Sequence, residues 1–149
     1  MNRLLPLIAI ALLFATNAMA SEPPVYTGLL SNTGAGGYDT VSYFEKGEPT
    51  KGSGDYTAEY LGATWRFASA ENLARFKTDP ERYAPAYGGY CAWAVSQGYL
   101  AKGDPRYWTI RDGRLYLNYS QSVQDTWLED PDGFISKADE NWPEVLEQE

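Results

Sequence analysis

The sequence predicts a small α+β domain built from two β-hairpins and several short helices. Apolar and polar residues alternate over 56–68 and again over 107–119, where Asp112-Gly113 forms a two-residue turn. Helical spacing of apolar residues follows Ser69 and Ser120. Because the strands come as hairpins and do not alternate with helices, the sequence does not predict a Rossmann-type parallel sheet.

Short helices are expected between the two hairpins. Ser69 is the predicted N-cap of a helix that ends near Thr78. Asp79-Pro80 predicts a second start, because an N-cap followed by proline is typical of a first helical turn. A glycine turn then leads into the apolar segment 90–95, which is expected to be a short helix.

Two further helices are predicted after the second hairpin. The first carries an apolar face over 123–128 and ends at Pro131–Gly133. The second spans 134–146, although Pro143 is an obstacle inside it. An Asp130-x-Asp132 pattern between them favours a capped turn over a calcium loop, because further oxygen ligands are missing. We find no internal repeat in the sequence.

The N-terminal residues have the pattern of a secretory signal peptide. A basic start at Arg3 precedes an apolar run from Leu4 to Thr16, and Ala18–Ala20 supplies a small-x-small cleavage site. The apolar run is shorter than the roughly 20 residues that a membrane-spanning helix needs. We therefore expect a signal peptide over 1–20, cleaved after Ala20, and a periplasmic or secreted protein that is not an integral membrane protein.

The remaining chain is long enough for one domain. Residues 21–37 are rich in glycine, proline and serine, and they predict a flexible leader. The domain is expected over 38–147, and it begins with an aromatic cluster at 38–44.

Composition excludes several function classes. The chain has 12 basic and 20 acidic residues, so binding to nucleic acid or to anionic lipid is disfavoured. It has no histidine, which removes the commonest general base and the commonest metal ligand. No glycine-rich phosphate-binding motif is present, so nucleotide binding has no support.

Several motifs together resemble the YHS-domain family, in its secreted single-domain branch. They are Tyr38-Asp39-x-Val41-x-Tyr43-Phe44, Tyr60-x-Gly62-x-x-Trp65-x-Phe67-Ala68-Ser69-x-Glu71-Asn72, Phe76-x-x-Asp79-Pro80-x-x-Tyr83-x-Pro85-x-Tyr87-Gly88-Gly89-Tyr90-Cys91-Ala92 and Asn141-Trp142-Pro143. The resemblance implies a treble-clef-like core and, in several members, a role in metal handling.

The residues that the family uses for metal binding are replaced in this chain. Metal-handling members place cysteines in a Val-Cys-Gly motif and in a Phe-Cys-Ser-x-x-Cys motif, where this chain has Ser42, Ala68 and Asn72. A structural zinc site needs about four Cys or His ligands. We therefore expect the fold to carry over without the metal site, with aromatic packing in place of the metal.

Cys91 is the only cysteine and the candidate reactive residue. Some relatives that resemble this branch carry selenocysteine at its position. In the first turn of a helix, backbone amides would lower the thiol pKa below its free value of about 8.5. Gly88, Gly89 and Tyr90 are the candidate ligand-binding residues, because glycines allow close approach to the backbone. The alternative is a small core residue, since no histidine is present to activate the thiol.

These observations leave three functions open. The first is a non-enzymatic binding or accessory module centred on 88–91, with an unknown protein or small ligand as partner. The second is a thiol-based redox protein in which Cys91 is oxidised to a sulfenic acid and restored by an external thiol. The third is an interaction scaffold with a buried Cys91. No cofactor is predicted, and a soft metal such as copper would need two copies of Cys91 from an oligomer.

Overall fold

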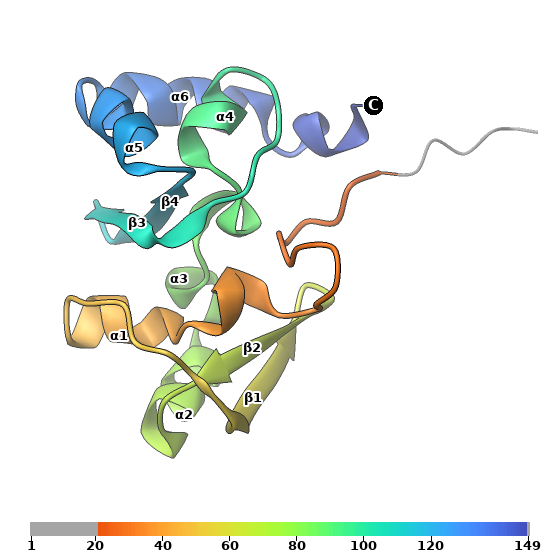
Figure 1. Ribbon diagram of the computed structural model, residues 1–149, viewed down its shortest axis with the longest axis vertical. Coiled ribbons are helices and arrows are strands. Elements are labelled where there is room, and N and C mark those ends of the chain that lie inside the picture. Colours follow the sequence, from red (N-terminus) through yellow and green to blue (C-terminus); the bar gives the residue numbers. More distant parts are fainter. Residues whose placement is uncertain (1–20, 149) are drawn as a thin grey trace, which may run out of the picture.

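The computed structural model describes residues 21–148, and the predicted signal peptide lies outside the described residues. Figure 1 shows two groups of elements, one above the other. The first group comprises η1 (Gly34–Gly37), α1 (Thr40–Glu45), β1 (Ser53–Tyr60), β2 (Ala63–Phe67), α2 (Ala70–Thr78) and α3 (Pro80–Tyr83). The second comprises η2 (Ala86–Gly89), α4 (Ala92–Ser96), β3 (Asp104–Arg111), β4 (Arg114–Asn118), α5 (Gln121–Leu128), α6 (Pro131–Asn141) and η3 (Glu144–Glu147). The predicted α+β class is confirmed.

Both predicted hairpins are present as two-stranded antiparallel sheets. β1 pairs with β2 and β3 pairs with β4. Each turn uses two residues with positive φ, Leu61 at 51° with Gly62 at 79°, and Asp112 at 50° with Gly113 at 76°. This is the geometry of a type I′ turn, which matches the right-handed twist of the strands that it joins.

The predicted caps are confirmed. The hydroxyl oxygen of Ser69 accepts a hydrogen bond from the amide of Asn72, and the carboxylate of Asp79 accepts one from the amide of Arg82. Ser120, which was not predicted as a cap, caps α5 in the same way.

Two boundaries differ from the sequence prediction. α6 begins at Pro131, because Asp130 caps it and proline fits the first helical position. It ends at Asn141 and does not continue through Pro143 to 146, where a separate turn, η3, follows. α1 lies in the segment where the sequence suggested only an aromatic cluster.

The two groups of elements repeat the same backbone. We call residues 34–83 the first unit and residues 86–141 the second unit. Each runs from a 3-10 turn through a short helix and a hairpin to two helices. In the 3-10 turns, Ala35 (φ 49°, ψ 35°) matches Tyr87 (φ 56°, ψ 32°), and Gly36 (φ 60°, ψ 19°) matches Gly88 (φ 62°, ψ 15°).

Backbone hydrogen bonds and pairing repeat as well. The amide of Asp39 donates to the carbonyl of Thr50 at 2.8 Å, and the amide of Cys91 donates to the carbonyl of Ala101 at 2.8 Å. Both hairpins carry a register irregularity at the same place, after the first pair of each ladder. The expectation that the chain has no internal repeat is therefore wrong.

Each unit has its own apolar core. The first is built around Trp65, Phe67 and Phe76, and the second around Val95 and Trp127. A third, small cluster of Tyr43, Leu115 and Leu117 joins the two units. The hydroxyl of Tyr43 donates to the carbonyl of Pro105 at 2.7 Å, which links α1 of the first unit to β3 of the second.

Part of the segment 21–37, expected to form a flexible leader, lies against the domain. Val25 is 1% exposed and belongs to the core of the first unit. The amide of Tyr26 donates to the carbonyl of Gly88, and the amide of Glu22 donates to the carbonyl of Leu146. The leader thus packs beside the second glycine turn, which the sequence could not show. Within the described part of the chain, no helix is long and apolar enough to cross a membrane.

Candidate functional site

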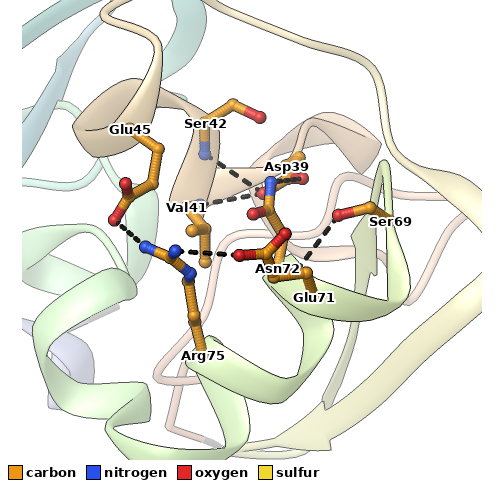
Figure 2. Close-up of polar contacts among 8 residues, drawn as sticks. All are labelled: Asp39, Val41, Ser42, Glu45, Ser69, Glu71, Asn72 and Arg75. Carbon is orange, nitrogen blue, oxygen red and sulfur yellow. Dashed lines mark hydrogen bonds and ion pairs between the residues drawn. The ribbon is translucent and has the colours of Figure 1, made fainter.

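The most extensive buried polar contacts centre on Asp39, which is 0% exposed (Figure 2). One carboxylate oxygen accepts hydrogen bonds from the amides of Val41 and Ser42 at the start of α1, at 2.9 and 3.2 Å. The other accepts from the amide of Ala68 and from the side-chain amide of Asn72, both at 2.8 Å. A buried carboxylate is stable only when it is hydrogen-bonded in this way. Asp39 therefore holds α1, the end of β2 and α2 together.

An exposed ion pair reinforces the same contact. The guanidinium of Arg75 on α2 reaches Glu45 on α1 and Glu71 one helical turn earlier (Figure 2). All three side chains face solvent, so this pair contributes less than the buried carboxylate.

Cys91 is the N-cap of α4, so it precedes the first helical turn in which it was expected. Its side chain is buried, with 1% exposed. Burial raises the pKa of its thiol, and the nearby amides of Ala94, Tyr119 and Trp93 oppose this rise only in part. The expectation of a lowered pKa is wrong, because loss of solvent outweighs the effect of the helix start.

Asn118 is the partner of Cys91, and sequence reasoning missed it. It is 0% exposed at the end of β4. Its side-chain oxygen accepts hydrogen bonds from the amide of Trp93 at 3.1 Å and from the thiol of Cys91 at 3.5 Å. Its side-chain nitrogen, Nδ2, has no partner among the described residues. No local signal could reveal this contact, because it depends on the fold of the second hairpin.

The glycine turn contacts the leader of the same chain. A Cβ atom at Gly88, where φ is +62°, would overlap the carbonyl oxygen of Pro24. The hydroxyl of Tyr90 donates to the carbonyl of Pro23 at 2.9 Å. The glycines were expected to let a ligand approach the backbone closely, and in the structure Pro24 of the same chain lies against Gly88.

A groove lies beside this turn, between the leader and the loop that precedes β3. Its volume is about 490 Å³. It is lined by Glu22, Pro23, Tyr26, Thr27, Gly28, Leu29, Tyr90, Tyr99, Leu100, Ala101, Lys102, Val145 and Gln148. Of the sequence-predicted site residues, Tyr90 lines this groove, whereas Gly88 lines a neighbouring hollow of about 330 Å³ and Cys91 lines neither.

Residues 41–87 match the family model of the YHS domain. This chain contains a YHS domain. The match starts in α1 and ends in η2, so the YHS domain coincides with most of the first unit and stops where the second begins. No curated protein and no solved structure matches the sequence.

The residues at the family's thiol positions meet at one point in the YHS domain. The backbone amides of Ser42 and Ala68 and the side-chain amide of Asn72 all donate to the carboxylate of Asp39. A hydroxyl, a methyl and an amide are not soft-metal ligands, so this site does not fit the metal of the metal-handling members. The expected replacement of the metal by aromatic packing is incomplete, because a hydrogen-bonded carboxylate lies at the centre of the site.

Proposed function

We propose that this chain is a secreted or periplasmic, non-enzymatic binding module whose ligand site is the groove beside Tyr90. The observation that carries the proposal is the position of the groove. It adjoins the glycine turn that the sequence singled out, and its volume of about 490 Å³ lies in the range of small-molecule sites.

The lining of the groove indicates the chemistry of the ligand. Tyr26, Tyr90 and Tyr99 supply aromatic surface, and Leu29 and Leu100 add aliphatic surface. Tyr26 and Tyr90 pack edge to face with ring centroids 5.6 Å apart, which fixes their orientation.

Charged groups of opposite sign complete the lining. Glu22 and Lys102 both line the groove. A positive group of the ligand would lie against Glu22, and a negative group against Lys102. The proposed ligand is therefore a small zwitterion with an apolar body, such as an aromatic amino acid or a dipeptide.

The position of Cys91 favours binding over thiol chemistry. A sulfur that is 1% exposed, with a raised pKa, offers neither an accessible nucleophile nor a surface ligand for a metal shared between two copies. Cys91 therefore supports the turn from inside, while Tyr90 and its neighbours meet the ligand.

The test measures binding of free aromatic amino acids and their dipeptides by calorimetry and thermal shift. Tyr99→Ala removes a ring that lines the groove and is 47% exposed. Leu128→Ala is the control, because Leu128 is also 47% exposed and does not line the groove. We expect at least one probe to bind the wild type and the control, and to bind Tyr99→Ala about tenfold or more weakly. Absence of binding to the wild type, or equal binding to all three proteins, would overturn the proposal.

Secretion has a separate test. The mass of the protein recovered from the periplasm or the medium should be that of a chain starting at Ser21. Recovery of the full-length chain from the cytoplasm alone would contradict this part.

A further inference from the structure

The lysine that lines the groove beside Tyr90 lies against an aromatic ring. Nζ of Lys102 is 5.5 Å from the centroid of the Tyr119 ring, within the range of a cation–π contact. Tyr119 itself does not line the groove. Within residues 21–148, no carboxylate forms an ion pair with Lys102, and Asp104 is paired with Arg106 at 2.7 Å. The ammonium is therefore held by a neutral ring, and its charge is available to a ligand.

The first unit has a matching lysine. Tyr38 and Lys51 form an isolated antiparallel bridge, and Tyr90 and Lys102 form the same bridge in the second unit. The residues directly before the two lysines, 50 and 101, accept equivalent backbone hydrogen bonds from residues 39 and 91. Both lysines are exposed. The lysine thus belongs to the repeated backbone and does not by itself distinguish the two units.

The aromatic ring does distinguish them. The second strand of each hairpin ends at an equivalent paired residue, Phe67 in the first unit and Asn118 in the second. The next residue is Ala68 in the first unit and Tyr119 in the second. Tyr119 is 48% exposed, although a tyrosine ring gains more free energy when it is buried. Of these two matching positions, the one with a large exposed ring is the one whose lysine lines the groove.

From this contact we propose that Tyr119 is a specificity-determining residue, which positions Lys102 so that the groove selects ligands with a carboxylate. The inference rests on the proposed function of the groove and adds a residue outside its lining. A lysine has a flexible four-carbon stem, so its charge has a fixed place only where a contact holds it. The ring attracts the ammonium without neutralising it. A ligand carboxylate then meets a charge that is already ordered, and binding loses less side-chain entropy.

The test compares each aromatic amino acid with the amine that lacks its carboxylate. The pairs are phenylalanine with phenethylamine, tyrosine with tyramine, and tryptophan with tryptamine. Calorimetry gives the ratio of the two affinities for the mature wild-type protein and for each variant. Tyr119→Leu removes the ring, and Tyr119→Phe keeps it. We expect the wild type to prefer the amino acid, Tyr119→Leu to lower this preference about two- to fivefold, and Tyr119→Phe to retain it.

A further pair of variants shows whether Tyr119 acts through Lys102. Lys102→Met removes the charge and keeps most of the stem, so it should abolish the preference for the carboxylate. When Tyr119→Leu is added to Lys102→Met, the ratio should not change again. A ring that merely supported the fold would affect the amino acid and the amine alike, whether or not Lys102 is present.

The outcomes separate this inference from the proposed function. If the wild type binds both members of each pair equally, or if Tyr119→Leu keeps the wild-type preference, the inference is overturned while the groove remains a binding site. If Tyr119→Phe loses as much preference as Tyr119→Leu, the ring does not position the lysine, and the inference is again overturned. If no amino acid, amine or dipeptide binds the wild type, the proposed function fails and the inference fails with it.

Discussion

Asp39 and Cys91 hold the same position in two successive copies of one backbone unit. Each follows a glycine turn and is the N-cap of a short helix. Asp39 caps its helix with its own carboxylate. At Cys91 the cap comes instead from Asn118, at the end of the hairpin. The first helix is therefore capped by the residue that directly precedes it, whereas the second is capped by a residue from the second hairpin.

Replacement of Asp39 tests the importance of that polar centre. We expect Asp39→Ala to lower the free energy of unfolding by about 3 kcal/mol or more, because it removes a helix cap and leaves buried donors at Ala68 and Asn72 without an acceptor. Urea denaturation measures the loss. Asp79→Ala is the control, because Asp79 is an exposed N-cap with one hydrogen bond and should cost about 1 kcal/mol. Equal losses in the two variants would show that Asp39 is an ordinary cap.

The local elements could be predicted because their signals are short-range. Asp112-Gly113 specifies its hairpin through the positive φ angles that the turn requires. Ser69 and Asp79-Pro80 specify helix starts through hydrogen bonds to amides three residues away.

The duplication could not be read from the sequence, because few residues are shared between the units. Gly36–Tyr38 matches Gly88–Tyr90, and Asp79-Pro80 matches Asp130-Pro131. These residues serve turns and caps, while the cores differ. The burial of Cys91 was also hidden, because its contact with Asn118 exists only once the second hairpin has folded against α4.

Gly88 should be intolerant of a side chain for two reasons. Its φ of +62° is strained for alanine, and a Cβ would overlap the carbonyl of Pro24. Gly88→Ala should therefore lower stability and release the leader, which limited proteolysis within 21–27 would reveal. Gly113→Ala is the matched control, since Gly113 has φ +76° and nothing within 4 Å of an added Cβ. It should show only the strain of about 1–2 kcal/mol, with the leader still protected. A leader that is equally resistant to protease in both variants would contradict the close packing seen at Gly88.

Alkaline pH should destabilise the fold through its buried tyrosines. Burial, with smaller effects of Glu22 and Tyr26, raises the pKa of Tyr90 to about 12, whereas an unfolded tyrosine titrates near 10. The native state thus holds its proton longer than the unfolded state. The stabilisation is complete below about pH 10 and is lost between about pH 10 and 12. Burial raises the pKa of Tyr87 and Tyr116 in the same direction.

Urea midpoints at about pH 8, 10 and 11, which lie below, at and above the pKa of an unfolded tyrosine, would measure this effect. Tyr90→Phe should lower stability by about 1 kcal/mol at pH 8, because the hydrogen bond to Pro23 is lost. Above pH 10 its stability should fall less steeply than that of the wild type. Parallel curves for the two proteins would assign the alkaline loss to other groups.

The burial of Cys91 predicts its reactivity toward alkylating reagents. The thiol is 1% exposed and its pKa is raised by burial, so labelling of the folded protein requires opening of the structure. If opening costs about 5 kcal/mol, labelling is slower than in denatured protein by roughly 10³–10⁴-fold. The ratio is measured by mass spectrometry after timed exposure to iodoacetamide, in buffer and in denaturant. An exposed thiol placed by Ser122→Cys in a Cys91→Ser background supplies the control, and it should label at nearly the same rate in both conditions. Rapid labelling of Cys91 in the folded wild type, with an apparent pKa below about 8.5, would instead restore thiol chemistry as the leading function.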